Sequence, residues 1–283
     1  MQQVEHIKQC REVVRAWRRD GASIGFVPTM GALHEGHISL VRKSLSAGHK
    51  TVASIFVNPK QFGPNEDYAK YPRVVDADAQ LLKDAGAHLL FAPNVDEMYE
   101  QDFATRVCVD GLTNYLCGPS RPGHFEGVAT VVTKLLNQVQ ADEAFFGEKD
   151  WQQLQVIKRL AIDLDIPTRI TGVEIMREAD GLALSSRNRY LSAADRAKAS
   201  LLNITLRSLA DEIAHDVLMG GSDINALLKT AVIGLTENGF SVDYLELADA
   251  ASLHPVRSLE KPARIFVAAR LGITRLIDNM AVN

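Results

Sequence analysis

Residues 26–37 of this 283-residue chain read FVPTMGALHEGH. A short apolar strand is followed by a tight turn and by two histidines, His34 and His37, at the start of an amphipathic helix. Residues three apart lie on the same face of a helix, so the two imidazoles are expected to point the same way. The amides and dipole of a helix N-terminus favour an anion, and Gly36 permits close approach to the backbone. The stretch therefore predicts an anion site suited to a triphosphate.

Strands and helices alternate through about the first 170 residues. We expect strands at 24–27, 51–57, 88–91, 144–146 and 170–175, and helices after 34 and at 76–85, 125–139 and 151–164. The run at 51–57 is almost continuously apolar, which is typical of a parallel strand covered on both faces. The alternation predicts an α/β fold, with a Rossmann-like doubly wound parallel sheet that binds ligands at the carboxyl ends of its strands.

The pattern changes near residue 176. Helical stretches at about 193–217 and 222–238 precede strands at 242–247, 264–269 and 274–277, which alternate as a small antiparallel sheet does. We therefore predict a Rossmann-like nucleotide- and substrate-binding domain over residues 1–175, followed by a smaller α+β domain over residues 176–283.

Composition excludes several classes of protein. A net charge of −4 argues against sequence-independent binding of nucleic acid, which requires a basic face. Eighteen apolar residues never occur together, so we expect no contact with a membrane. The three cysteines form no CxxC pair, and the first eight residues do not resemble a signal peptide. We therefore expect a cytoplasmic protein with reduced thiols.

The two histidines have other possible explanations. A metalloprotease-type zinc site has the pattern His-Glu-x-x-His, whereas His34 and His37 are one residue closer and no third ligand stands out. An ordinary helix with exposed histidines is the simpler alternative. The pattern does match the His-x-Gly-His signature of the nucleotidylyltransferase superfamily, whose members attack the α-phosphate of a nucleoside triphosphate.

Polar residues also follow the other predicted strands. Gln61 carries an amide that suits a substrate with hydroxyl and carboxylate groups, although a loop glutamine needs no such role. Arg121, in a turn before a helix, either faces a phosphate or forms a surface salt bridge.

Residues 145–154 combine a strand end with a charged helix start. Gly147 permits a ligand to approach the backbone, and Lys149 supplies a point charge for phosphate. Asp150 is either an N-cap or an acceptor for a ribose hydroxyl. Gln153, one helical turn further on, is expected to face the same cavity as Gln61.

Residues 176–192 contain a further candidate for phosphate binding. Ser185 and Ser186 offer two adjacent hydroxyls, and Arg187 follows them directly. The arrangement resembles the mobile KMSKS loop of the same superfamily.

Taken together, these motifs resemble the pantoate–β-alanine ligase family. The matching segments occur in order over nearly the whole chain, at residues 27–37, 55–62, 71–73, 120–125, 146–153, 180–190 and 275–279. The resemblance implies an enzyme that joins pantoate to β-alanine with ATP through a pantoyl adenylate, releasing AMP and pyrophosphate.

The resemblance also implies roles for individual residues. The catalytic set comprises His34, His37, Lys149 and Arg187. The remaining ATP contacts fall on Pro28, Met30, Gly147, Asp150, Met176, Ser185 and Ser186, and the pantoate contacts on Met30, Gln61 and Gln153. Arg121 is a candidate for a second-site cation.

The family is expected to use Mg²⁺, held mainly by ATP and water. Ala77 interrupts the acidic run that some relatives carry after Tyr-Pro-Arg, so Asp78 is only a weak candidate ligand. The resemblance also implies a homodimer formed through the N-terminal domain and a C-terminal domain that acts as a lid.

Three alternatives stay open at this point. The first is a cofactor nucleotidylyltransferase, which leaves the nucleotide on its product, but Gln61 and Gln153 suit a small hydroxy acid better. The second is an RNA-binding relative of the aminoacyl-tRNA synthetases, which the acidic balance disfavours. The third is a non-catalytic nucleotide sensor, which would not need the full set of histidines and cations.

Overall fold

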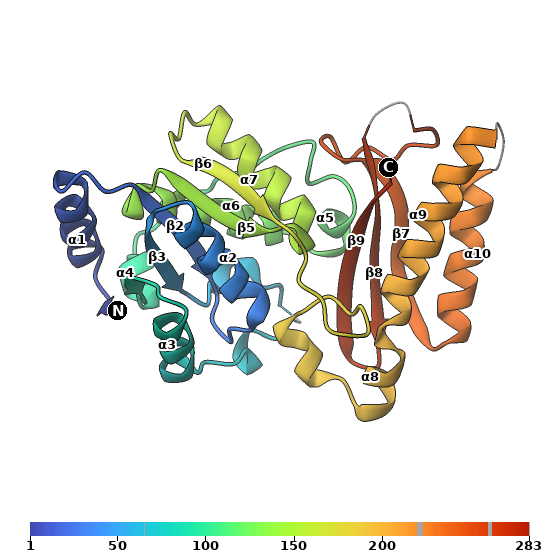
Figure 1. Ribbon diagram of the computed structural model, residues 1–283, viewed down its shortest axis with the longest axis horizontal. Coiled ribbons are helices and arrows are strands. Elements are labelled where there is room, and N and C mark those ends of the chain that lie inside the picture. The colour runs from blue at the N-terminus through green and yellow to red at the C-terminus, as the bar shows by residue number, and fades with distance from the viewer. Residues whose placement is uncertain (65, 220–222, 260–261, 283) are drawn as a thin grey trace. The chain divides into compact units, whose positions relative to one another are not determined.

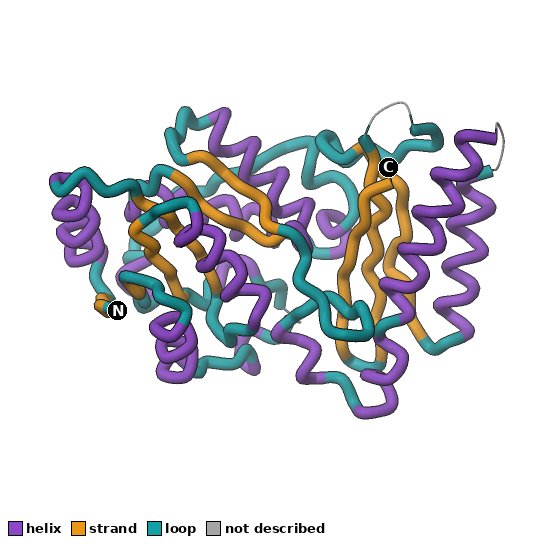
Figure 2. The backbone as a smooth tube through the Cα atoms, in the orientation of Figure 1, coloured by secondary structure: helices purple, strands orange, loops and turns teal. Residues whose placement is uncertain are grey.

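The computed structural model describes residues 1–64, 66–219, 223–259 and 262–282 and contains a parallel sheet and a separate antiparallel sheet (Figures 1 and 2). The chain divides into two units, each assembled from three segments. The first unit comprises Met1–Asp110, Arg121–Glu148 and Val156–Glu174, and the second comprises Gly111–Ser120, Lys149–Gln155 and Ile175–Asn283. The sequence pattern predicted the start of the second unit near residue 176. It did not predict that Gly111–Ser120 and Lys149–Gln155 also belong to that unit. The binding and lid functions assigned to the two parts stay predictions.

Six strands of the first unit form a parallel sheet in the order β1-β4-β3-β2-β5-β6. They are β1 (Gln2–Val4), β2 (Ile24–Thr29), β3 (Lys50–Ile55), β4 (Leu89–Phe91), β5 (Glu143–Gly147) and β6 (Arg169–Val173). All but the first residue of β3 are buried, as expected for a strand covered on both faces. The predicted doubly wound α/β fold is therefore confirmed.

Helices connect these strands on both faces of the sheet. They are α1 (Ile7–Arg19), α2 (Glu35–Ser46), α3 (Val75–Asp84), α4 (Val95–Met98), α6 (His124–Val139) and α7 (Trp151–Asp163). Helix α2 packs beside α3, whereas α6 packs beside α1, and in Figure 1 α2 crosses in front of the sheet. The strand order reverses at β2, which lies between β3 and β5. In such sheets ligands bind outside the carboxyl ends of the strands at the point of reversal.

The second unit contains the antiparallel sheet β7-β8-β9. Its strands are β7 (Phe240–Asp249), β8 (Ala263–Leu271) and β9 (Thr274–Val282). Its helices include α5 (Cys117–Ser120), α8 (Ala193–Ala199), α9 (Leu201–Met219) and α10 (Ile224–Glu237). Helix α9 packs on β9 and α10 packs on β7. The predicted small α+β unit is therefore present.

The structure corrects the prediction of one helix over 193–217. The helix ends at Ala199, and α9 begins at Leu201 with the carbonyl of Ser200 accepting the N–H of Ile204. The apolar spacing runs on unchanged across this break, which is why the sequence pattern did not reveal it. The buried positions are Ala199, Leu202, Leu206, Leu209 and Ile213. The predicted start of the next helix, residue 222, lies outside the described residues.

Two N-terminal elements were not predicted. Strand β1 is only three residues long, and α1 buries only Cys10 and Val14, so neither produces a strong apolar pattern. Within the part of the chain that the structure describes, no helix has both the length and the apolar character needed to cross a membrane.

Candidate active site

The turn after β2 lies at the point of strand reversal and is held by a buried carboxylate. Asp78, on α3, accepts the backbone N–H of Ala32 at 2.7 Å and that of Leu33 at 2.8 Å, and the residue is only 2% exposed. Gly31 has a φ of +83°, and a Cβ atom there would come within 3.0 Å of Asp78 Oδ2. Asp78 therefore shapes the turn, with each of its carboxylate oxygens accepting one backbone N–H.

The two histidines of this turn lie together, as their spacing predicted. Their ring centroids are 4.1 Å apart. His34 is the N-cap of α2 rather than its first residue, and its Nδ1 accepts the N–H of Gly36 at 3.1 Å. The Nδ1 of His37 accepts the N–H of His34 at 3.3 Å. A backbone N–H can only donate, so each neutral ring carries its proton on Nε2. Nε2 is therefore the donor nitrogen of each ring, and an imidazole N–H is a group that suits an anionic phosphate.

Met30 and Gln61 are also brought together. Gln61 lies on the 3₁₀ turn η1 (Pro59–Gln61), and its Nε2 donates to Met30 Sδ at 2.8 Å. Its Oε1 accepts a hydrogen bond from Asn58 Nδ2 at 3.0 Å. Sequence reasoning did not single out Asn58, although the Asn-Pro pair that ends the strand segment marked a turn there. The half-buried Met30 and the buried Gln61 therefore form one surface beside the histidine turn.

Arg121 forms a salt bridge with Glu66, which was the second of the two possibilities that the sequence left open for it. Its Nε and Nη2 atoms donate to the two carboxylate oxygens of Glu66 at 2.6 and 2.7 Å, and Nη1 donates to His124 Nε2 at 2.8 Å. Burial acts to raise the pKa of Glu66, but the hydrogen bonds and charge of Arg121 outweigh it, so that the pKa is lowered to about 2. This geometry does not support Arg121 as a second-site cation, because its donors serve protein groups.

Gly147 ends β5, next to β2 in the sheet. A Cβ atom placed on Gly147 would meet no protein atom within 4 Å, so the space in front of this backbone is open. Pro28, on β2, is half-buried, and Asp150 is exposed at the end of the 3₁₀ turn η3 (Glu148–Asp150). The open space at Gly147 is what close approach of a ligand requires.

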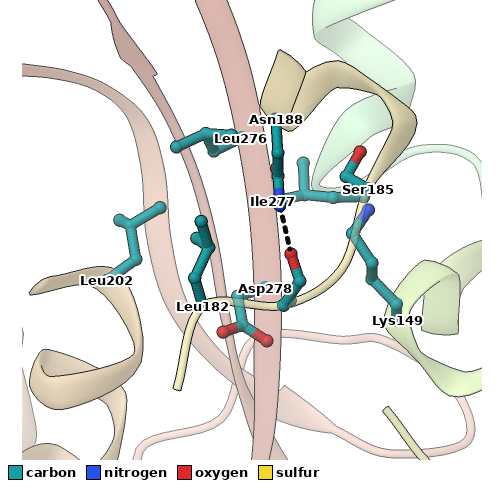
Figure 3. Close-up of a pocket in the computed structure, with 9 residues that line it drawn as sticks. Lys149, Leu182, Ser185, Asn188, Leu202, Leu276, Ile277 and Asp278 are labelled. Atoms are coloured by element: carbon teal, nitrogen blue, oxygen red, sulfur yellow. Dashed lines mark hydrogen bonds between the residues drawn. The ribbon is translucent and has the colours of Figure 1, made fainter. Parts of the chain in front are cut away.

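A pocket in the second unit contains two of the predicted phosphate-binding residues. It is lined by Lys149, Leu182, Ala183, Ser185, Asn188, Leu202, Leu276, Ile277 and Asp278. Figure 3 shows the Lys149 side chain pointing toward Ser185. Ser185 caps the 3₁₀ turn η4 (Ser186–Tyr190), and its Oγ accepts the N–H of Arg187 at 3.3 Å. The structure therefore brings the lysine and the first serine of the predicted phosphate grip to one pocket.

Part-buried polar contacts that the sequence did not reveal lie in and near this pocket. Arg177 donates to both carboxylate oxygens of Asp278, at 2.6 and 2.9 Å. Asn188 Nδ2 donates to the carbonyl of Ala183 at 3.1 Å, within the pocket drawn in Figure 3, and to Glu178 at 3.0 Å. These partners lie 5 to 101 residues apart, so no short motif could have identified them all.

The remaining predicted residues are on the surface of the second unit. Met176 is 37% exposed, and its carbonyl accepts the N–H of Leu184 at 2.9 Å. Gln153 is half-buried on α7, whereas its neighbour Gln152 is buried and bonds the backbone at Cys117. Gln61 and Gln153 belong to different units, and their pairing in one cavity stays a prediction.

Among the described residues, no group of three or more His, Cys, Asp or Glu side chains is arranged to hold a metal ion. A magnesium ion carried by a nucleotide does not need such a group, since phosphate oxygens and water supply most of its ligands.

The doubly wound sheet, the paired histidines and the open strand end at Gly147 define a nucleotide-binding α/β enzyme. The family model described as pantoate-β-alanine ligase matches residues 2–281. The pantothenate synthetase of Paramagnetospirillum magneticum is 56% identical over 280 residues, which cover 99% of this chain and 97% of the relative. The chain therefore belongs to the pantoate–β-alanine ligase family, and it is an ATP-dependent ligase that joins pantoate to β-alanine.

Solved structures agree with this membership. The pantothenate synthetase of Thermus thermophilus is 45% identical, with a TM-score of 0.92, and the match covers 100% of this chain and 99% of that one. The pantoate-β-alanine ligase of Francisella tularensis, solved in complex with β,γ-ATP and β-alanine, is 35% identical, with a TM-score of 0.78 and coverage of 99% and 97%.

Proposed function

We propose that this ligase works through a pantoyl adenylate formed beside the histidine turn. A carboxylate oxygen of pantoate attacks the α-phosphorus of ATP, a new P–O bond forms, and the bond to pyrophosphate breaks. The amine of β-alanine then attacks the acyl carbon, loses a proton, and displaces AMP. The protein has to position these groups and stabilise charge on phosphate oxygens, and no enzyme nucleophile is required.

The observation that carries this proposal is the pair of imidazole N–H donors at the point of strand reversal. Because both Nδ1 atoms accept backbone amides, the two rings are preorganised as donors before any ligand arrives. Donors fixed in advance stabilise developing negative charge without reorganising, and removing one typically costs about 3 kcal/mol of barrier. We assign His34 and His37 to the α-phosphate during adenylation.

The other residues take supporting roles in this proposal. Gly147 and Asp150 bind the ribose, the backbone at Pro28 and Met176 meets the adenine, and Met30, Gln61 and Gln153 bind pantoate. The β- and γ-phosphates are assigned to Lys149, Ser185, Ser186 and Arg187. The pocket that holds Lys149 and Ser185 supports the last assignment.

Several expectations accompany the proposal. Mg²⁺ is expected to neutralise charge on the triphosphate and to be held mainly by ATP oxygens and water. The homodimer, the cytoplasmic location and the closure of the C-terminal part over the reactants stay predictions.

The first experiment is pantoate-dependent exchange of labelled pyrophosphate into ATP in the absence of β-alanine. Exchange that requires pantoate supports the adenylate. If exchange is absent, formation of AMP with both substrates has to be measured, because trapped pyrophosphate prevents exchange. A folded protein that neither exchanges pyrophosphate nor forms AMP when pantoate and β-alanine are both present contradicts the proposed mechanism.

A further inference from the structure

A chain of hydrogen bonds from a distant tyrosine holds the side chain of Gln61. Tyr99 Oη lies 2.8 Å from Asn58 Oδ1, Asn58 Nδ2 lies 3.0 Å from Gln61 Oε1, and Gln61 Nε2 lies 2.8 Å from Met30 Sδ. We call this sequence of contacts the Tyr99 relay. All four residues belong to the first unit.

Backbone groups fix the direction of the relay at Asn58. The backbone N–H of Lys60 donates to Asn58 Oδ1 at 3.2 Å, and Asn58 Nδ2 donates to the carbonyl of Gly127 at 3.1 Å. An N–H only donates and a carbonyl only accepts, so the Asn58 amide has a single orientation that satisfies both. Tyr99 must therefore be the donor to Asn58 Oδ1.

The same logic sets the orientation of Gln61. Because Asn58 Nδ2 donates, the atom of Gln61 that faces it must be the acceptor Oε1, and the NH₂ group is directed to the side of Met30. The backbone of Gln61 is held as well, since its carbonyl lies 2.8 Å from Nδ1 of the buried His124. Gln61 therefore presents a hydrogen-bond donor, which matches a carboxylate or hydroxyl oxygen.

We propose that Tyr99 is a positioning residue for the acid substrate: together with the backbone groups of Lys60 and Gly127, its hydroxyl holds the Asn58 amide in place, and Asn58 in turn keeps the NH₂ group of Gln61 directed at the oxygens of pantoate. This inference rests on the proposed function, in which Met30 and Gln61 bind pantoate.

Tyr99 is suited to this role because its ring is anchored independently of its hydroxyl. The residue is 8% exposed, and its ring lies 4.9 Å from that of Phe103 and 6.0 Å from that of Phe56. The ammonium of Lys60 lies 5.0 Å from the ring centroid. Burial raises the pKa of the Tyr99 hydroxyl, so it stays a donor throughout the working pH range. Replacement by phenylalanine would remove the donor and leave this packing in place.

The first test is Tyr99→Phe, assayed by AMP formation with both substrates. If the full contribution of one hydrogen bond is lost from pantoate binding, the KM for pantoate rises roughly 2- to 13-fold. The KM for ATP and the thermal midpoint of unfolding should change little. Tyr244→Phe is the matched control, because it removes a hydroxyl that bonds Cys117 Sγ at 3.1 Å outside the relay. An unchanged KM for pantoate in folded Tyr99→Phe overturns the proposal.

A double-mutant cycle tests whether Tyr99 acts through Gln61. In a Gln61→Ala background, Tyr99→Phe should raise the KM for pantoate no further, because the group that it orients is gone. The same fold-change in both backgrounds would show that Tyr99 acts by another route.

Asn58→Asp provides a second variant in case Tyr99→Phe does not fold. It keeps acceptors for Tyr99 and Lys60 but offers no donor to Gln61 Oε1 or to the carbonyl of Gly127. We therefore expect a lower thermal midpoint of unfolding together with a rise in the KM for pantoate, and an unchanged KM in the folded variant contradicts the relay. Failure of the proposed function is a separate result: the unmodified protein would then form no AMP with pantoate and β-alanine.

Discussion

The rings of His34 and His37 lie with their centroids 4.1 Å apart, and each ring accepts a backbone N–H of the turn that carries it. The histidines thus cap helix α2 with one ring nitrogen and carry a proton on the other. A substitution of His34 can therefore separate the structural role from the chemical one, because the side chains of Asn and Gln each reproduce only one of these two positions.

His34→Asn should preserve the fold and remove the activity. The Asn oxygen can replace Nδ1 as the acceptor from Gly36, and Asn is among the best N-cap residues, so the free energy of unfolding should change by less than about 0.5 kcal/mol. Turnover should fall by roughly two to three orders of magnitude because the Nε2–H donor is lost. Chemical denaturation and AMP formation measure the two effects.

His34→Gln is the complementary control for this prediction. Its amide reaches the Nε2 position but caps poorly, so it should lose about 1 kcal/mol of stability and keep more activity than His34→Asn. Turnover close to that of the unmodified protein in folded His34→Asn would contradict the assignment of the ring to the phosphate.

Gly147→Ala should weaken ATP binding without destabilising the protein. The added methyl group meets no protein atom within 4 Å, so any interference has to come from a ligand that approaches this backbone. We expect the KM for ATP to rise roughly tenfold, which corresponds to about 1.4 kcal/mol.

Gly234→Ala, on α10, is the matched control for Gly147, because its Cβ position is also open. Helix propensity should stabilise this variant by up to about 1 kcal/mol, with no change in the KM for ATP. If Gly147→Ala and Gly234→Ala behave alike in steady-state kinetics, nucleotide does not approach Gly147.

Asp78→Asn tests whether this carboxylate supports the turn or binds a metal ion. An amide keeps one acceptor but places a donor against the second backbone N–H, so we expect a loss of about 1–3 kcal/mol in the free energy of unfolding. The magnesium concentration that gives half-maximal rate should stay the same. A large shift in that concentration, with stability unchanged, would assign Asp78 to the metal instead.

The ion pair of Arg121 with Glu66 should make stability depend on pH. The pKa of Glu66 is about 2 in the folded protein, whereas the ordinary value for a glutamate side chain is 4.5. A lowered pKa contributes stability that is complete above the unfolded value and is lost as the pH falls from about 4.5 to 2. Urea unfolding should therefore show Glu66→Gln to be less stable at pH 7, by about 1–3 kcal/mol, with the difference shrinking toward pH 2.

The comparison with Glu66→Gln is needed because another carboxylate titrates in the same range. Burial opposes ionisation of Glu143, but hydrogen bonds from Arg169, Thr171 and His49 lower its pKa to about 2. The unmodified protein and the variant share this contribution, so it cancels in their difference. A stability difference that stays constant from pH 7 to pH 2 would contradict the assigned role of the Glu66 carboxylate.

The sequence predicted the features that depend on local pattern. The sequence signals for the buried strand β3 and for the histidine turn after β2 each lie within about a dozen consecutive residues. Both features are present in the structure. Helix α1 was missed because it buries only two side chains. The interruption at Ser200 was missed because apolar spacing continues across it.

The contacts that orient the candidate site could not be predicted in this way. Tyr99 meets Asn58 across 41 residues, and Glu66 meets Arg121 across 55. Tyr99, Asn58 and Glu66 are unremarkable in their own segments. The sequence did single out Arg121, but it could not identify Glu66 as its partner. Sequence motifs thus identified residues proposed to touch ligands, whereas the side chains that hold them in place required the structure.

The division of the chain into two units restricts how the protein can be taken apart. The backbone passes from one unit to the other at residues 110/111, 120/121, 148/149, 155/156 and 174/175. Neither unit can therefore be produced as an uninterrupted gene fragment, and a cut at any single position leaves at least one fragment with segments of both. A single crossover between the genes of two relatives would leave at least one unit with segments from both parents. We expect this architecture to be inherited and engineered as a whole rather than exchanged as separate modules.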